Sequence, residues 1–419
     1  PAERARVQAL FGSLFVLAFL IGPTLGGLFT DTIGWRWVFY INLPISLVAI
    51  FVVWRFMPSL HYEGPRKRFD IAGVILFVAA VVPFLIGVRN LPDGALTDLA
   101  VGGLMLLGLA VGLVFLIVES YAHDPIVPVR LFGDRTFATA SAVVFLSVAG
   151  LFVGVVFMPR YFQLVHDASA TESGWQIMTL LFGLIAGAVL GGLTVARTGR
   201  WKVLLLGAMI VGIVGMLLLT RLDADTELPY VWAAMFVTGL GLGPITSILT
   251  AVIQSTSPPE TMGVATSALT TFRQLGASIW LAIGGSYFTS VFDDRLPGQL
   301  RASGVPGELA AGLTEGGGTI GSEQSTVVGD LGATILAAVP DEARAQVEPF
   351  VAAIVEGMHA AVSLATGNVF WIGIGATAVA FLVLLPLHEV PLPTRAQTQA
   401  AETRDDAEGV DERFAGEPA

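Results

Sequence analysis

Long apolar runs, separated by short polar linkers, dominate the chain from one end to the other. Ten of these runs approach the roughly twenty residues that a helix needs to cross a bilayer. Apolar residues follow one another within each run instead of alternating with polar ones, which argues against a β-barrel. The pattern therefore predicts an all-α polytopic membrane protein. The predicted spans are residues 8–30, 37–57, 70–89, 99–120, 137–159, 174–195, 202–220, 229–253, 263–292 and 364–387.

Composition supports a membrane protein and excludes one class of site. Hydrophobic residues make up 54% of the chain and charged residues 13%, with a mean hydropathy of +0.76. A soluble globular chain would carry about a quarter charged residues. No cysteine occurs, so neither a disulfide nor a thiolate metal site is possible. None of the five histidines forms a pair with the spacing of metal ligands.

The net charge of −11 is concentrated in two segments. Residues 293–362 hold ten acidic and three basic residues, and residues 388–419 hold eight acidic and three basic ones. The rest of the chain, including every span, is close to neutral. The overall acidity therefore does not indicate a cationic substrate.

Lys and Arg residues in the short loops predict the orientation of the spans. If the start of the chain is cytoplasmic, eleven of these residues lie on the cytoplasmic side and four on the opposite side, as the positive-inside rule requires. Residues 293–362 then form a long extracellular loop, with a helical pattern from about Asp341 to Val362. The tail, residues 388–419, is cytoplasmic, and its polar acidic composition predicts disorder.

The first apolar run carries a glycine motif. Ala18, Gly22 and Gly26 recur every fourth residue, so on a helix they form a ridge that lets another backbone approach closely. Pro23 lacks an N–H group and should bend the helix at that point. Together with Gly27 these residues form the sequence GPTLGG, which predicts a bent helix with a close-packing face.

The GPTLGG segment, followed by WRWVFYINLP at residues 35–44, resembles the antiporter motif of the major facilitator superfamily. The segment is similar to the version of this motif found in EmrB/QacA-type drug/proton antiporters. Weaker matches follow in the family's order at residues 159–163 (PRYFQ), 239–243 (GLGLG) and 273–276 (RQLG). The resemblance implies a fourteen-span protein that this chain matches from about the fifth span onward. The chain, which starts at Pro1, is therefore expected to be truncated at its amino terminus.

The resemblance also implies a division into domains. Residues 1–57 would be the last two spans of the first six-helix bundle, and residues 58–136 two extra linker spans with a cytoplasmic loop. Residues 137–387, including the extracellular loop 293–362, would be the second six-helix bundle. The disordered acidic tail, 388–419, follows.

By the same resemblance, the function is secondary active transport in the plasma (inner) membrane. The expected activity is multidrug efflux, with protons as the coupling ion and drugs or other hydrophobic or cationic small molecules as substrates. No cofactor and no nucleic-acid partner are expected. The family's proton-carrying carboxylate would lie in a span that precedes Pro1.

Several alternatives remain at this point. A facilitator or uptake transporter of another small solute is the alternative within the superfamily. A membrane-embedded enzyme would need clustered catalytic or metal-binding side chains within the spans, and a channel would need a filter segment or a ring of charges. The sequence shows neither, and it has no GxxxxGK[ST] motif for ATP binding.

Arg273 is the one clear charge inside a predicted span. It lies about ten residues past the cytoplasmic end, or ~15 Å deep, near the middle of the bilayer. A charge at that depth should face protein or a water-filled cavity. Arg273 either organises the substrate or proton pathway or binds helix-end carbonyl groups as a structural residue. No Asp or Glu lies equally deep; Asp31 and Glu119 sit at span ends, where a solvated charge is the ordinary interpretation.

Other polar and aromatic residues would line a central cavity with Arg273, by resemblance to the family. Aromatic side chains can instead anchor a helix at the membrane interface. Threonine hydroxyls in a helix often bond to their own backbone. The candidates are Tyr161, Gln163, Trp175, Gln176, Thr246, Thr250, Gln274 and Trp280.

The span at residues 174–195 carries a second glycine ridge. Gly183, Gly187 and Gly191 repeat every fourth residue, as the small residues of the first span do. By resemblance, the two spans belong to opposite bundles. The two ridges are therefore predicted to meet at the interface between the bundles.

The linker after this span resembles the cytoplasmic loop motif of the superfamily. The family carries an acidic residue where this chain has Ala196, so the usual gating ion pair is in doubt. Arg197 and Arg200 are expected to anchor the loop through their charge. Gly199 is expected to form a tight turn.

Overall fold

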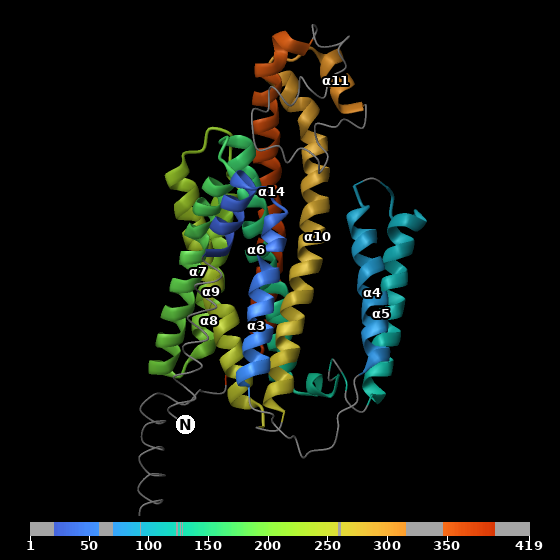
Figure 1. The fold of residues 1–419 in the computed structure, drawn as a ribbon, viewed down its shortest axis with the longest axis vertical. Coiled ribbons are helices and arrows are strands. Elements are labelled where there is room, and N and C mark those ends of the chain that lie inside the picture. The colour runs from blue at the N-terminus through green and yellow to red at the C-terminus, as the bar shows by residue number, and fades with distance from the viewer. Residues whose placement is uncertain are drawn as a thin grey trace, which may run out of the picture.

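The computed structural model describes most of the chain, and the described residues are helical, with no β-strand among them (Figure 1). Ala18, which belongs to the predicted ridge, lies outside the described residues, as does nearly all of the acidic tail. The described residues are 21–57, 70–92, 94–122, 125, 127, 129–258, 261–315 and 347–389.

Nine helical segments in these ranges are long and apolar enough to cross a membrane, and they match the second to tenth predicted spans. Residues 21–32 form a further helix at the end of the first predicted span. The prediction of an all-α polytopic membrane protein is therefore confirmed. The nine segments are α2 (Trp37–Tyr40) with α3 (Asn42–Phe56), α4 (Ile71–Arg89), a π-helical turn (η1, Leu99–Gly103) with α5 (Leu104–Tyr121), α6 (Arg135–Val165), α7 (Ala170–Thr198), α8 (Trp201–Leu219), α9 (Leu228–Thr256), α10 (Met262–Ala302) and η3 (Glu348–Phe350) with α14 (Val351–Leu384).

Local sequence explains where several helices begin and end. Asp134 begins α6, since its carboxylate accepts a hydrogen bond from the Thr136 amide at 2.6 Å. Ser169 and Glu172 form a reciprocal capping box at the start of α7. Gly199 ends α7 with a φ of 68°, the left-handed conformation that glycine adopts without strain.

The helices α6 to α10 and α14 pack against one another as one bundle. Its core contains large, fully buried side chains such as Trp201, Tyr161, Phe162 and Phe370. The helices α4 and α5 form an antiparallel pair (Figure 1). The helix α4 also contacts α10. This bundle is the frame that holds most of the candidate site residues.

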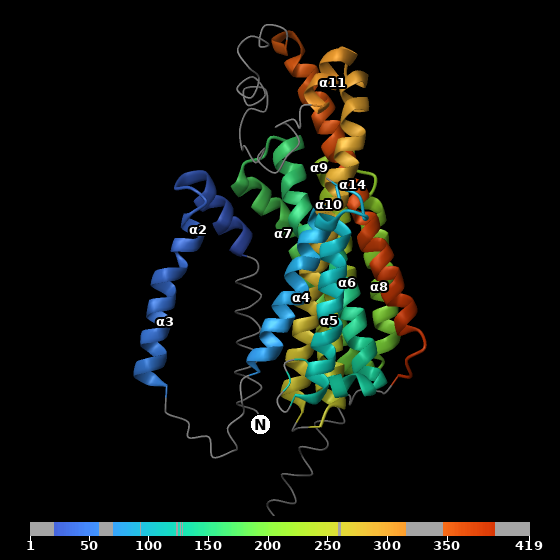
Figure 2. The same ribbon diagram turned by 90° about the vertical axis from the view of Figure 1, so that its right-hand side faces the viewer.

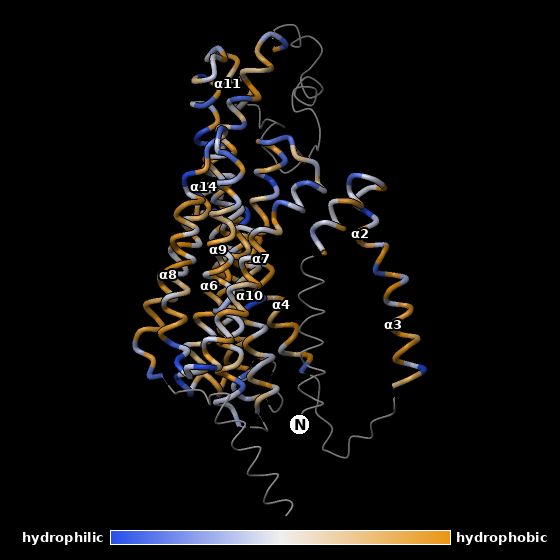
Figure 3. The backbone as a smooth tube through the Cα atoms, turned by 90° about the vertical axis from the view of Figure 1, so that its left-hand side faces the viewer, coloured by the Kyte–Doolittle hydropathy of each residue, from blue (hydrophilic) through white to orange (hydrophobic). Residues whose placement is uncertain are grey.

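The helix α3 contrasts with the bundle. It lies apart from the bundle in Figure 2, and none of its residues is buried. Figure 3 shows that hydrophobic residues predominate along it, as they do along the bundle helices. Its apolar surface is therefore available to lipid or to other protein.

The predicted ends of the last two spans are wrong. Hydropathy placed them at residues 292 and 364, whereas α10 continues to Ala302 and α14 begins at Val351. Leu296 and Leu300 are buried on this extension of α10, and a short helix, α11 (Gly307–Glu315), follows it. Figure 1 shows α10 and α14 rising together beyond the other helices. The predicted loop is therefore helical at both ends. At the second end this agrees with the helical pattern predicted from about Asp341 to Val362, whose described part, from Glu348 onward, is helical.

Candidate functional site

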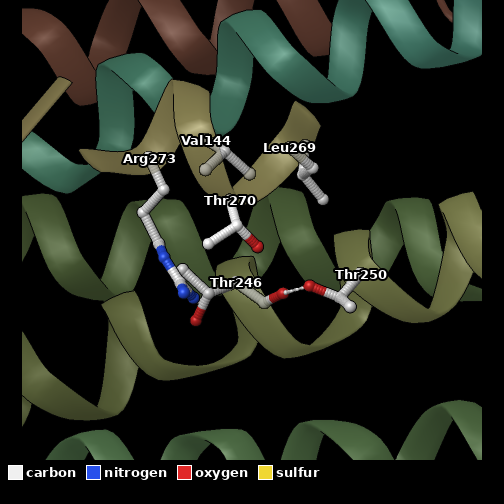
Figure 4. A pocket seen from close by; sticks show the side chains of 6 residues that line it. All are labelled: Val144, Thr246, Thr250, Leu269, Thr270 and Arg273. Carbon is white, nitrogen blue, oxygen red and sulfur yellow. Dashed lines mark hydrogen bonds between the residues drawn. The ribbon is translucent and has the colours of Figure 1, made fainter. Parts of the chain in front are cut away.

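Arg273 lines a small pocket where α6, α9 and α10 meet (Figure 4). The pocket encloses about 180 Å³ of empty space when its open side is included. Thr246 and Thr250 of α9 lie across from Arg273, so the structure brings three of the predicted site residues together. The remaining lining residues are Val144, Leu269 and Thr270.

The pocket offers hydrogen-bond donors. Arg273 is half-buried, and among the described residues it makes neither an ion pair nor a hydrogen bond. The hydroxyls of Thr250 and Thr270 donate to the carbonyls of Thr246 and Thr266 at 2.7 and 3.0 Å, as expected for threonine in a helix. The Thr246 hydroxyl has no such acceptor in the described part of the chain. The guanidinium and one hydroxyl therefore remain open to a ligand.

Tyr161 and Gln163 do not line this pocket. Tyr161 is fully buried, and it lies seventeen residues beyond Val144 on α6, which is ~25 Å along the helix. Its hydroxyl donates to the Asp223 carbonyl at 3.0 Å. Gln163 donates from Nε2 to the Ser173 hydroxyl of α7 at 2.8 Å. Both side chains bond to neighbouring segments at the far end of the bundle, and their place in a central cavity stays a prediction.

A histidine that sequence reasoning did not single out joins Tyr161. His166 follows the last residue of α6, and its Nε2 lies 3.2 Å from the Tyr161 hydroxyl. Burial, helped by the nearby His359, lowers the pKa of His166, while Asp167 acts in the opposite direction. No three His, Asp or Glu side chains of the described residues gather as metal ligands.

The aromatic and amide candidates separate into different environments. Trp280 donates from Nε1 to the Phe145 carbonyl at 2.9 Å and so ties α10 to α6. Trp175 is 60% exposed on the surface of α7, as expected for an interface anchor. Gln274 is exposed beside the pocket, and the Gln176 Oε1 atom is buried without a hydrogen-bond partner in the described ranges.

The glycine ridge of α7 packs on α9, so its predicted role at the bundle interface is wrong. A Cβ added at Gly183 or Gly187 would collide with the Phe236 or Leu240 carbonyl of α9. In return, Gly239 and Gly243 of the GLGLG segment approach the backbone of α7, while Gly241 approaches α8. A repeat of small residues predicts a close approach, but it does not say which helix approaches.

The helix at residues 21–32 does contact α7, but through other glycines. A Cβ at Gly174 would lie 2.7 Å from the Pro23 carbonyl oxygen, and one at Gly27 would collide with the Ala170 carbonyl. Gly22 and Gly26 have nothing within 4 Å of such an added atom. This backbone contact joins the GPTLGG segment to the start of α7.

Asp31 completes this contact, a role that sequence reasoning missed. Its carboxylate accepts hydrogen bonds from the amides of Thr171 at 2.7 Å and Ala170 at 3.2 Å, and also from the Thr171 hydroxyl. It therefore satisfies N–H groups that the first turn of α7 leaves free. Burial would raise the pKa of Asp31, but these hydrogen bonds outweigh it and lower the pKa below 3.8. An available signal was the position of Asp31 one turn beyond the glycine pair.

The linker after α7 has the predicted turn at Gly199, with Arg197 and Arg200 exposed. The basic residue with anchoring contacts is instead Lys202. Its Nζ donates to the Leu385 carbonyl at 2.7 Å, and its backbone amide donates to the Glu389 carboxylate at 2.9 Å. These bonds fasten the start of α8 to the end of α14.

Known proteins resemble this chain over most of its length. The Major Facilitator Superfamily profile matches residues 1–281. The multidrug transporter protein MdtP of Bacillus subtilis (strain 168) is 36% identical over 286 residues, which is 68% of this chain and 52% of that protein. Multidrug resistance protein 3 of the same strain is 30% identical over 318 residues, or 75% of this chain and 61% of that protein.

A third relative covers nearly all of the chain. It is an uncharacterized MFS-type transporter of Mycobacterium tuberculosis (strain CDC 1551 / Oshkosh), 30% identical over 417 residues, which is 98% of this chain and 54% of that protein. The chain thus spans between 52% and 61% of the length of these three relatives. The match to the superfamily profile over residues 1–281, together with the multi-span helical fold, shows that this chain belongs to the major facilitator superfamily.

Proposed function

We propose that this chain takes part in proton-coupled export of small hydrophobic molecules across the plasma membrane by alternating access. One relative is named a multidrug transporter and another a multidrug resistance protein, which supports export of drug-like molecules. The half-buried polar pocket at Arg273, set among apolar spans, supports a binding function inside the membrane. Protons are the proposed coupling ion by resemblance to the antiporter group.

The observation that carries this proposal is the contact between the helix at residues 21–32 and α7. Alternating access requires one helix bundle to rock against another, so the surfaces that meet must be close and yet separable. Here, Gly27 and Gly174 bring two backbones together over a short distance. Leu25 and Leu28 of the same helix are each 43% exposed, so little apolar packing holds the contact closed.

The experiment compares two glycines of α7. A side chain at Gly174 would meet the backbone at Pro23, whereas Gly192 has open space around it. Residues 1–419 alone, a form with four preceding spans restored, and the Gly174→Leu and Gly192→Leu variants of the restored form are reconstituted into proteoliposomes containing the dye Nile red. Dye movement is then followed after a pH gradient is imposed, with and without a protonophore.

The form with four preceding spans restored is expected to move dye only while the gradient lasts. Residues 1–419 alone are not expected to move it, because the proton-carrying carboxylate implied by the family resemblance lies outside them. Gly174→Leu should slow that movement about tenfold or more, because the contact can no longer close, and Gly192→Leu should leave it unchanged. A rate of dye movement that the protonophore leaves unchanged would contradict proton coupling. Equal rates for the two variants would contradict a working role for the contact.

A further inference from the structure

We propose that the Arg273 pocket binds an oxyanion, a carboxylate or a phosphate, on an amphipathic small molecule. Arg273 would hold the anion through its guanidinium, and Thr246 would add a hydroxyl donor. The inference deepens the proposed transport function. It rests on that function only where the ligand is regarded as a transported substrate. It departs from the cationic substrates that the family resemblance implies.

The charge of Arg273 is not balanced within the described structure. Arg273 lies eleven residues after the start of α10 at Met262, or ~16 Å along the helix. The pocket around it consists of three threonines and two apolar residues. The described acids of α6, α9 and α10 lie at or just before a helix end, such as Asp134, or on the far extension of α10, such as Asp294. A cation set deep in a membrane span calls for an anionic partner, and a bound ligand can supply it.

The geometry of the donors suits an oxyanion. Figure 4 shows the Arg273 side chain reaching from α10 toward Thr246 on α9. A guanidinium presents its N–H groups as a planar fork, which matches two oxygens of a carboxylate or phosphate. Thr250 and Thr270 already donate to backbone carbonyls, so Thr246 has the hydroxyl that is left to donate.

The size and surroundings of the pocket point to an amphipathic ligand. The pocket is small and open on one side, so it has room for a polar head group and not for a whole drug-sized molecule. Thr270, Gln274 and Ser278 follow at helical spacing along one exposed face of α10. The anionic group therefore fills the pocket, and the rest of the ligand lies along this face. A cationic group would meet the like charge of Arg273.

The test measures equilibrium binding and needs no transport. The full chain is purified into phosphatidylcholine nanodiscs and titrated with three fluorescent probes: dansylglycine, its neutral amide, and the cation dansylcadaverine. The variants are Arg273→Gln, Arg273→Lys and Thr246→Val. Arg197→Gln is the matched control, because it removes the same charge from an exposed position on α7.

Dansylglycine is expected to bind the unmodified chain about tenfold tighter than its amide. Arg273→Gln should abolish this preference, Arg273→Lys should keep part of it through charge alone, and Thr246→Val should weaken it by a few-fold. Arg197→Gln should retain the full preference. Equal binding of dansylglycine and its amide, tightest binding of the cation, or an undiminished preference in Arg273→Gln would each overturn the proposal.

A second arm distinguishes a substrate from a lipid headgroup. Phosphatidylglycerol is added to the nanodiscs. If it weakens dansylglycine binding severalfold in the unmodified chain but has no effect in Arg273→Gln, a lipid phosphate is the anion. If binding of the carboxylate probe persists undiminished, a soluble carboxylate is the anion. Because binding is read without a pH gradient, failure of Nile red transport would overturn the transport proposal and leave the pocket standing.

Discussion

The helix α7 meets two neighbours through glycines, and the two interfaces are built differently. Against α9, Gly183 and Gly187 lie under opposing carbonyls while Gly239 and Gly243 lie against α7, so the two backbones interlock from both sides. Against the helix at residues 21–32, contact is confined to the first turns of α7 and ends at the carboxylate of Asp31. In lipid, close packing is what holds helices together, so the first interface is suited to permanence and the second to separation.

The largest effect is expected where the interlock is broken. In Gly187→Leu the added side chain would collide with the Leu240 carbonyl of α9, which is backbone and cannot rotate away. Overpacking of this kind costs about 3 kcal/mol or more. Thermal unfolding of the detergent-purified variant should therefore start several degrees lower than that of Gly192→Leu. Matching unfolding curves for the two variants would show that the interlock does not limit stability.

A smaller, local effect is expected at the other interface. Asp31→Ala removes the acceptor for two amides at the start of α7, and loss of such a cap costs about 1 kcal/mol. That energy corresponds to about a fivefold change in the population of the closed contact. Thermal unfolding of the bundle should stay unchanged, which separates this variant from Gly187→Leu.

Because the chain has no cysteine, a pair of introduced cysteines can report how often the helix at residues 21–32 contacts α7. Thr24 Oγ1 lies 4.0 Å from the Sδ atom of Met178, so the pair Thr24→Cys and Met178→Cys should crosslink when the contact is closed. Crosslinking should fall about fivefold when Asp31→Ala is added. Thr32→Ala is the control, because the Thr32 hydroxyl bonds only to Leu28 of its own helix. Unaltered crosslinking in Asp31→Ala would show that the Asp31 carboxylate does not stabilise the contact.

The smallest effect is expected from pH. Because the pKa of Asp31 is lower in the folded protein, the ionised form is favoured there, and its contribution is fully present above the ordinary value of 3.8. That contribution is lost only as the pH falls through the still lower folded value. Crosslinking of the cysteine pair, with a reagent insensitive to pH, should be constant from about pH 7 to pH 5 and weaken below pH 3.8. A decline in crosslinking between pH 7 and pH 5 would show that a titratable group other than Asp31 controls the contact.

Sequence patterns predicted the helices better than they predicted their ends. Nine of the ten predicted spans appear as spanning helices in the described residues, because the bilayer sets one length scale for all of them. The apolar runs misplace the ends of α10 and α14 because the burial of Leu296 and Leu300 comes from packing between helices beyond these runs. Hydropathy indicates whether a helix is surrounded by lipid or by water. The ends of α10 and α14 depend instead on contacts with other helices.

The candidate site was predictable only in part, for a related reason. The family resemblance associated Arg273 with Thr246 and Thr250, and all three line the same pocket. Tyr161 and Trp280 also looked like cavity residues, yet each bonds to a backbone carbonyl on a neighbouring segment. A polar side chain in a span needs a partner, and the sequence does not reveal whether that partner is a ligand or the protein.

The continuous course of α10 makes it a rigid connection between the middle of its apolar span and its far end. Twenty-four residues separate Arg273 from Pro297, which is ~36 Å of helix. A rigid arm of that length turns a tilt of about ten degrees at the pocket into a displacement of about 6 Å near Pro297. A movement of α10 that is too small to resolve at the pocket would thus be larger near Pro297. Reagents in the aqueous phase could detect it there.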